Sequence, residues 1–328
     1  MDKTRGAAKS LWTLNLITHP RYLRHDTGGG EHPEVPARLE VISRELARRE
    51  DLFHLVTREP QAAARPWLLK IHSEDYLLRF EEAALAGRSY LGHHDNQLGY
   101  ETYEIALLAA GGGLAGIDLV EQADSPATVF CSVRPPGHHA EKALALGFCF
   151  LNNVAVAARY WQEKHQRRRV AILDFDAHHG NGIQDAFEED PEVFYISLHE
   201  HPTFSFPGTG HAEERGTGVG KGATLNIPLL PGQGDVEVKA AFADQIIPAL
   251  ARFRPEALLV AAGFDGHRLD DMAGLAYSTE LYGWLGAQLA GLANHHCDGR
   301  LVSILEGGYN LDVLGESVVR YCAGLVGR

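Results

Sequence analysis

Carboxylate, imidazole and glycine residues follow one another in the segment 172–182, whose sequence is ILDFDAHHGNG. Alternate side chains of an extended chain share one side, so Asp174, Asp176 and His178 would face the same way. Carboxylate oxygens and an imidazole nitrogen together suit a divalent transition metal such as Zn²⁺. The alternative is an ordinary turn between a strand and a helix, in which Asp and Asn side chains cap the helix. The elements around the segment decide between these interpretations.

Short apolar runs alternate with helical segments along the chain. Strands are predicted at 11–17, 127–133, 169–175, 193–198, 224–229, 257–262 and 301–305. Helices are predicted at 34–50, 73–86, 102–120, 150–165, 183–189, 236–253, 278–293 and 310–326. This alternation predicts an α/β fold with a mostly parallel central sheet and helices on both faces. Because we find no linker or internal repeat, we expect a single catalytic domain over residues 1–328.

Polar side chains gather at the predicted carboxyl ends of five strands. They are His138 and His139, Asp176 and His178, Ser197 and His199, Asp265, and Tyr309, and the apolar Phe206 lies in the loop after His199. In open parallel sheets the ligand crevice lies along that edge, so these distant loops are predicted to form one site.

Asp176, His178 and Asp265 would give a metal three ligands and leave one position open, as in a catalytic zinc site. The alternative is a set of ion-paired core carboxylates. His138 and His139 are less suited to chelation, because neighbouring side chains of an extended chain diverge. We expect acid–base work from them, in which one imidazole takes a proton from the water that the metal activates and later delivers it to the leaving group.

Two aromatic features have a functional and a structural interpretation. Tyr309 lies in a Gly-Gly-Tyr turn, and its hydroxyl could donate to a developing oxyanion or simply lie on the surface. Phe148 and Phe206 could wall a narrow apolar slot or pack in the core.

The composition limits the class of protein. Thirty Lys and Arg against 43 Asp and Glu give a net charge of −13, which disfavours general binding to nucleic acid or anionic membranes. The four cysteines, Cys131, Cys149, Cys297 and Cys322, form no Cys-x-x-Cys pair, so we expect free thiols in a reducing compartment. No run is expected to span a bilayer, and the protein is predicted to be soluble and cytoplasmic.

Several segments resemble the zinc-dependent histone deacetylase superfamily. They are RPPGHHA at 134–140, GFCFLNN at 147–153, DFDAHHGNG at 174–182, GFD at 263–265, EGGY at 306–309 and the entry segment at 32–39. Similar proteins include class II-like bacterial histone deacetylase-like amidohydrolases, acetylpolyamine amidohydrolases and acetoin-utilisation-type proteins. The matches occur in family order over nearly the whole chain.

The resemblance implies an arginase/deacetylase fold and hydrolysis of an acetyl amide. It implies that Asp176, His178 and Asp265 bind one zinc ion per subunit, and that His139 is the general base and then the acid. It further implies that His138 is an electrostatic partner toward which Asp174 is oriented, and that Tyr309 polarises the acetyl carbonyl.

The resemblance also implies a substrate channel and structural potassium ions. The channel residues are Gly147, Phe148, Phe206 and Met272, with Asp95 as a rim carboxylate for the substrate backbone. One K⁺ is implied near Asp174, Asp176, His178, Ser197 and Leu198, and a second monovalent site near Phe187, Asp190 and Val193.

Asn181 departs from relatives that have an acid paired with the second histidine. A neutral amide should raise the pKa of His139 less than a carboxylate would, and the variant resembles the class II and bacterial branch. The hypothesis is that Asn181→Asp moves the acidic limb of the pH–rate profile upward; an unchanged limb would count against it.

The predicted substrate is an acetylated, or other short-acyl, lysine side chain or a related acylated amine. Polyamine-selective relatives place a Glu near Met272, so its absence favours acyl-lysine over acetylpolyamine. Glu31, Asp270, Asp271 or a neighbouring subunit of a homo-oligomer could supply negative charge instead. Acyl length, oligomeric state and the choice of zinc or iron stay open.

Two rival functions remain. A binuclear manganese ureohydrolase needs more bridging carboxylates, whereas Gly180 stands two positions after His178, and Gly266 and His267 follow Asp265. A catalytically silent metal-binding scaffold or sensor would be suggested by loss of Tyr309 or of a histidine, and these residues are present.

Overall fold

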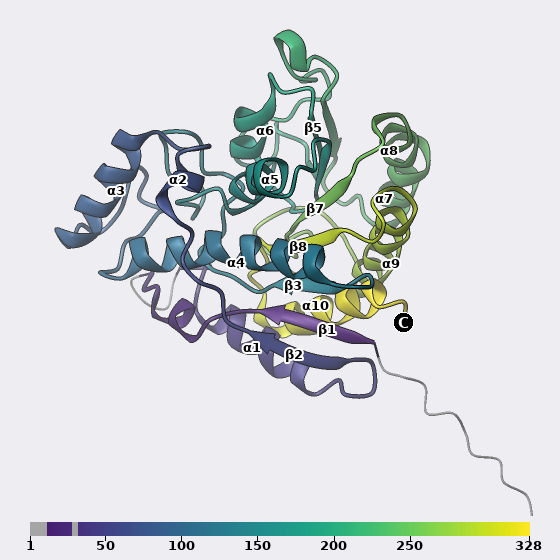
Figure 1. Ribbon diagram of the computed structural model, residues 1–328, viewed down its shortest axis with the longest axis horizontal. Helices are drawn as coiled ribbons and strands as arrows, with labels where there is room; N and C mark the ends of the chain where they lie inside the picture. The colour runs from purple at the N-terminus through teal and green to yellow at the C-terminus, as the bar shows by residue number, and fades with distance from the viewer. Residues whose placement is uncertain (1–11, 28–31) are drawn as a thin grey trace, which may run out of the picture.

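A single sheet of eight parallel strands forms the centre of the protein (Figure 1). The computed structural model describes residues 12–27 and 32–328. The sheet order is β2-β1-β3-β8-β7-β4-β5-β6. The strands are β1 (Thr13–Ile17), β2 (His54–Arg58), β3 (Thr128–Cys131), β4 (Val170–Asp174), β5 (Val193–Glu200), β6 (Thr224–Leu229), β7 (Ala257–Ala262) and β8 (Leu301–Leu305). The predicted α/β class with a parallel sheet is confirmed.

Helices cover both faces of the sheet. They are α1 (Ala37–Ala47), α2 (Arg65–Leu68), α3 (Glu74–Leu85), α4 (Thr102–Gln122), α5 (Asn153–Lys164), α6 (Asn181–Phe187), α7 (Asp235–Ala241), α8 (Ile247–Phe253), α9 (Thr279–His296) and α10 (Leu311–Leu325). In Figure 1, α4 and α5 lie over one side of the strands, and α1 and α10 lie together on the other. The polar edge strand β2 and the short helix α2 were not predicted from the sequence.

Helix α4 packs unusually close to the sheet because of its glycines. A Cβ on Gly112 would lie 2.6 Å from Val133, and one on Gly113 would lie 2.8 Å from Ile304. A Cβ on Gly111 would lie only 1.9 Å from the Gln61 carbonyl oxygen on the far side. The absence of side chains at these three positions therefore allows the close packing of α4.

The expectation that no segment is long and apolar enough to span a bilayer was wrong, because one helix meets both criteria. Helix α4 has 21 residues and a mean hydropathy of 1.4 over its most apolar window. However, 72% of that window is buried inside the protein, as in the core helix of a globular fold. The same apolar composition therefore serves packing between the sheet and the helices around it.

The predicted helix over 236–253 is interrupted. A π-helical segment, Phe242–Ile246, separates α7 from α8, and Pro248 follows in the first turn of α8. Proline has no backbone N–H and its ring crowds the preceding turn, so a regular α-helix cannot continue through it.

The five loops expected to form a site follow five consecutive strands at the centre of the sheet. In order these strands are β3, β8, β7, β4 and β5. Because all are parallel, their carboxyl ends meet at one edge, and the loops there lie side by side. Strand β5 ends at Glu200 rather than at residue 198, so His199 lies within it rather than after it.

Candidate metal centre and active site

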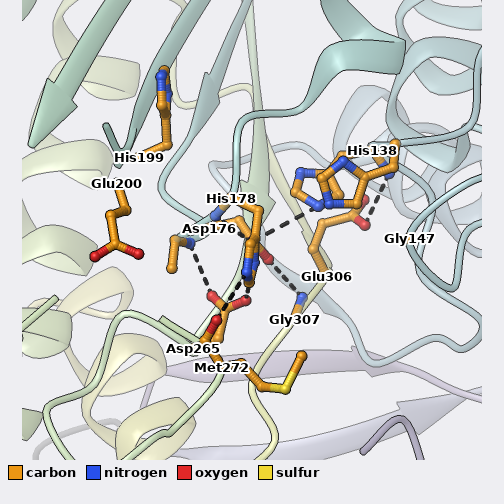
Figure 2. Close-up of polar contacts among 12 residues, drawn as sticks. His138, Gly147, Asp176, His178, His199, Glu200, Asp265, Met272, Glu306 and Gly307 are labelled. Carbon is orange, nitrogen blue, oxygen red and sulfur yellow. Dashed lines mark hydrogen bonds and ion pairs between the residues drawn. The ribbon is translucent and has the colours of Figure 1, made fainter. Parts of the chain in front are cut away.

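Asp176, His178 and Asp265 converge at the carboxyl edge of the sheet. One ligand atom from each lies within 4.8 Å of the others, and all three residues are buried. Figure 2 shows His178 beside the carboxylates, with its Nδ1 3.2 Å from Asp176 Oδ1 and 2.9 Å from Asp265 Oδ2. Its other ring nitrogen, Nε2, is 3.1 Å from the carbonyl oxygen of Met272. A proton on Nε2 therefore leaves the Nδ1 lone pair facing the cluster.

Backbone amides hold the two carboxylates in place. Gly307 N donates to Asp176 Oδ2 at 2.8 Å, and Ala177 N donates to Asp265 Oδ1 at 2.9 Å. Glycine is required at two positions beside them. A Cβ on Gly307 would lie 2.4 Å from Asp265 Oδ2, and one on Gly263 would lie 2.0 Å from Asp176 Oδ2.

The charge of this cluster fits a bound cation. Burial and the neighbouring Asp176 carboxylate raise the pKa of Asp265 to about 7. In the described part of the chain, neither carboxylate forms an ion pair with a lysine or arginine. Among the described residues, histidines are the only cationic side chains that pair with these two buried carboxylates, so a bound cation would offset their negative charge. Two oxygen donors and one nitrogen donor suit zinc.

His138 is held against the floor of the site by Asp174. Its Nδ1 lies 3.1 Å from Asp174 Oδ2, as the resemblance implied. Burial alone would lower the pKa of His138, but the charges of Asp176 and Asp174 raise it to about 10. Its backbone N–H donates to the buried carboxylate of Glu306 at 3.0 Å, a contact drawn in Figure 2.

His139 lies beside His138 rather than away from it. The expectation that the two rings diverge was wrong, because their centroids are 4.0 Å apart. The strand β3 has ended by this point, so the alternation of an extended chain no longer applies. Burial, followed by the charges of His138 and His178, lowers the pKa of His139 well below its usual value. The surrounding charges thus favour the cationic form of His138 and the neutral form of His139.

Tyr309 packs over the site from the loop after β8. Its ring is 5.7 Å from that of Phe148, and the Arg38 guanidinium lies 4.8 Å from its centroid. Burial raises the pKa of Tyr309 well above its usual value, so the phenol keeps its proton.

A buried ion-pair network supports this loop, and sequence reasoning missed it. Arg38 donates to the carbonyl oxygens of Glu306 and Gly308, the latter at 2.6 Å. Glu34 binds Arg38 at 3.2 Å and Arg134 at 2.7 Å, and all three side chains are fully buried. The available signal was their position: charged residues stand inside the motif segments 32–39 and 134–140, next to apolar strand ends.

The predicted channel residues surround the histidines. Phe206 packs edge-on against His139 at 4.9 Å and is 41% exposed. Phe148 has a φ of 68°, which turns its ring toward Tyr309. Gly147 is required here, since a Cβ would lie 2.4 Å from His139 Cδ2.

Asp95 lies in the loop beside Phe148, with a partly exposed side chain. Its backbone carbonyl is 3.0 Å from His32 Nε2, and the His32 ring packs 4.7 Å from Phe148. The neighbouring Asn96 Oδ1 accepts from Phe148 N at 2.8 Å. The loop bearing Asp95 is therefore fastened to the channel wall.

Asp270 does not offer rim charge, contrary to one sequence-based alternative. It is buried and accepts hydrogen bonds from the amides of Tyr309, Asn310 and Met272. Asp271 is exposed, and Glu31 lies outside the described residues.

The residues of the first predicted potassium site also come together. Asp174 and Ser197 are partners across β4 and β5, and both are buried. In the second predicted site, Asp190 N donates to Phe187 O at 2.9 Å and Val193 N to Asp190 O at 3.4 Å. Potassium at either place stays a prediction.

Comparison with protein families agrees with this geometry. Residues 32–325 match the histone deacetylase domain. The chain belongs to the histone deacetylase family. It is accordingly a deacetylase, a hydrolase of a family that is generally zinc-dependent, and its buried Asp–His–Asp cluster fits that dependence.

Relatives of this deacetylase come from plants, archaea and bacteria. It is 40% identical to histone deacetylase 10, chloroplastic, of Oryza sativa subsp. japonica, over 97% of this chain and 76% of that protein. It is 38% identical to a probable deacetylase of Archaeoglobus fulgidus, covering 90% and 81% of the two chains. It is 38% identical to the histone deacetylase-like amidohydrolase of Pseudomonas aeruginosa, covering 90% and 75%. The crystal structure of the HDA15 HD domain superposes with a TM-score of 0.89 at 32% identity, covering 96% of this chain and 90% of that one.

Proposed function

We propose that this deacetylase removes acetyl or other short acyl groups from the side-chain amide of acyl-lysine. The observation that carries the proposal is the meeting of three kinds of group at one edge of the sheet. A buried Asp–His–Asp cluster, a neutral imidazole and a protonated phenol lie there together.

Zinc, when held by Asp176, His178 and Asp265, would supply a Lewis acid that polarises the acyl carbonyl and makes a water acidic enough to attack it. Neutral His139 takes the proton of that water and then delivers it to the departing amine. His138 stays cationic beside Asp174 and stabilises the negative charge that develops nearby.

Tyr309 donates its hydroxyl proton in a hydrogen bond to the developing oxyanion. Phe148 and Phe206 hold the aliphatic part of the substrate side chain between their rings, and Gly147 leaves room beside His139. Asp95 accepts hydrogen bonds from the substrate backbone at the rim. The raised pKa of Tyr309 supports its role, because only the protonated phenol can donate.

Acyl-lysine is preferred over acetylpolyamine as the substrate. Polyamine-selective relatives place a Glu near position 272, which is a methionine here, and Asp270, one carboxylate that could replace it, is buried under the Tyr309 loop. We propose further that residues 1–328 act as one catalytic domain, which the single sheet supports. Action in the cytoplasm stays a prediction from the cysteine pattern, and the lack of direct contact with nucleic acid or membrane stays a prediction from the net charge of −13.

A side-by-side turnover assay tests this function. The zinc-loaded and iron-loaded protein is offered an acetyl-lysine peptide, a longer acyl-lysine peptide and acetylated putrescine or spermidine. We expect the acetyl-lysine peptide to be hydrolysed fastest and Tyr309→Phe to lower kcat on the order of 10²–10³-fold.

The matched control is Tyr100→Phe, which removes a hydroxyl from a residue that is 73% exposed and should leave kcat unchanged. Near-normal turnover by Tyr309→Phe would remove the oxyanion role. Faster turnover of the acetylated polyamines would reverse the substrate assignment, and no turnover of any acyl amide would favour the silent scaffold.

A further inference from the structure

Asn181 binds the proposed base through its amide oxygen. The residue begins α6 directly after the metal-binding loop and is 8% exposed. Its Oδ1 lies 2.7 Å from His139 Nδ1. An amide oxygen only accepts hydrogen bonds, so in this arrangement Nδ1 carries the proton and Nε2 keeps its lone pair.

An asparagine alone does not guarantee that arrangement. Rotation of the amide by half a turn would present the NH₂ group to His139, and the imidazole would then carry its proton on Nε2. A histidine in that second tautomer has no lone pair on Nε2 with which to accept a proton. The base therefore depends on whatever fixes the orientation of Asn181.

Two acceptors on the far side of the amide fix it. Asn181 Nδ2 donates to Glu141 Oε1 at 2.8 Å and lies 3.4 Å from the backbone oxygen of His139. A flipped amide would set its oxygen against both of these acceptors. The shorter contact is to an ionisable carboxylate, and a hydrogen bond to a charged acceptor is roughly twice as strong as one between neutral groups.

Glu141 is itself held by the surrounding backbone. Its N–H donates to the carbonyl oxygen of Leu144 at 3.0 Å, and its own carbonyl oxygen lies 3.0 Å from His72 Nδ1. The half-buried carboxylate thus reaches Asn181 from an anchored turn two residues after His139. The mechanism proposed above assigns no role to this carboxylate.

We propose that Glu141 is a positioning residue for deacetylation: by accepting from Asn181 Nδ2 it sets the amide orientation that keeps a lone pair on His139 Nε2. The proposal rests on the proposed function of His139 as base. Where similar proteins pair the second histidine with an acid, this chain divides the task between a neutral amide that touches the ring and a carboxylate behind it.

The test compares three substitutions in the zinc-loaded protein. Glu141→Met removes the acceptor at similar size, and we expect kcat on acetyl-lysine peptide to fall about tenfold with KM within about twofold, since part of the acid–base contribution is lost. Glu141→Gln keeps an amide oxygen that can accept, so it should restore most of the loss. Asp185→Asn is the matched control: it neutralises an exposed carboxylate of α6 that does not contact Asn181 and keeps an oxygen that can accept the long 3.5 Å contact from Lys142 N, so it should leave kcat unchanged.

A double substitution separates positioning from general structural support. In the Asn181→Asp background both side-chain oxygens accept, so no orientation has to be set. Glu141→Met should therefore cost nothing in that background, and relief of repulsion between the two carboxylates should even raise kcat. An equal loss of kcat in both backgrounds would overturn the proposal.

The tautomer of His139 gives a readout that does not depend on turnover. Ring ¹⁵N NMR of histidine-labelled protein, assigned with His139→Ala, should show Nδ1 protonated in the wild type and in Glu141→Gln, and a mixture in Glu141→Met. Unchanged tautomer and kcat in Glu141→Met would overturn the proposal.

If the wild type hydrolyses no acyl amide, the proposed function fails, while the NMR comparison still decides the role of Glu141. If Glu141→Met does not fold, Glu141→Ala takes its place: Nε2-protonated His139 in excess of the Asp185→Asn control supports the proposal, and none overturns it.

Discussion

Gly307 brings the backbone into contact with both carboxylates of the metal centre. Its N–H donates to Asp176 Oδ2, and a Cβ at this position would lie 2.4 Å from Asp265 Oδ2 and 2.6 Å from Asp176 Oδ2. We expect Gly307→Ala to displace the two ligands and to lower zinc affinity about 10–100-fold, as loss of the contacts that orient ligands does. Zinc content after dialysis against a chelator, measured by atomic absorption, checks this.

The control for this substitution is Gly291→Ala, where a new Cβ meets nothing within 4 Å. It should retain the wild-type zinc content. Full zinc occupancy in Gly307→Ala would show that the carboxylates can move aside without loss of binding.

At the scale of single residues, the ligand and catalytic groups were easier to predict from the sequence than the groups that position them. Asp176, His178 and Asp265 stand at fixed offsets from strand ends, so the fold alone brings them together. The contact from Glu141 to Asn181 depends on the course of a turn that no periodicity describes. Asp270 shows the opposite error, since its charge suggested a rim position while its oxygens bind buried backbone amides.

Helices α9 and α10 pack against each other at close range, and small residues make this possible. A Cβ on Gly286 would lie 2.2 Å from the carbonyl oxygen of Tyr321 in α10, whereas Gly291 of the same helix faces open space. We expect Gly286→Ala to lower the free energy of unfolding by about 1–3 kcal/mol through overpacking. Gly291→Ala should raise it by about 0.5–1 kcal/mol, because alanine loses less backbone entropy than glycine in a helix.

Urea unfolding of the two variants beside the wild type measures both changes. Because the substitution and the helix are the same, intrinsic helix propensity cancels between them, and the difference reports packing against α10. Equal effects of the two substitutions would contradict the close approach of the helices.

The five central strands were predicted to within two residues at either end, whereas the partly exposed strand β2 was missed. Strands β7 and β8 have the predicted bounds because burial on both faces demands continuous apolar runs. Strand β2 has no fully buried residue, so its pairing with β1 leaves no apolar pattern in the sequence. Pro248 indicates a break between α7 and α8, but the apolar spacing of the residues around it favoured the prediction of one continuous helix.

For the molecule as a whole, buried neutral histidines make stability depend on pH. Burial lowers the pKa of His72 to about 4 from its ordinary 6.5, and its Nε2 accepts a backbone hydrogen bond from Asn152 at 2.9 Å. Below pH 6.5 the unfolded chain binds a proton that the folded one refuses, so this contribution to stability is full above pH 6.5 and is lost as the pH falls toward 4. The buried rings of His25, His179 and His199 act in the same direction.

We expect the free energy of unfolding of the wild type to fall, relative to His72→Gln, by up to about 1.4 kcal/mol per pH unit between pH 6.5 and 4. Urea unfolding of both proteins across this range measures the difference. A difference that stays constant with pH would mean that His72 titrates alike in the folded and unfolded chains.

The bonds from Arg38 to the loop bearing Tyr309 also matter during protein synthesis. Arg38 leaves the ribosome 270 residues before Gly308, whose carbonyl oxygen it binds. Until residues 306–309 have been synthesised, the Asp176 carboxylate lacks its hydrogen bond from the Gly307 amide. Arg38 likewise lacks the carbonyl oxygens that it binds in this loop. A chain that lacks residues 306–309 therefore carries its metal-binding motif without the backbone contacts that orient it.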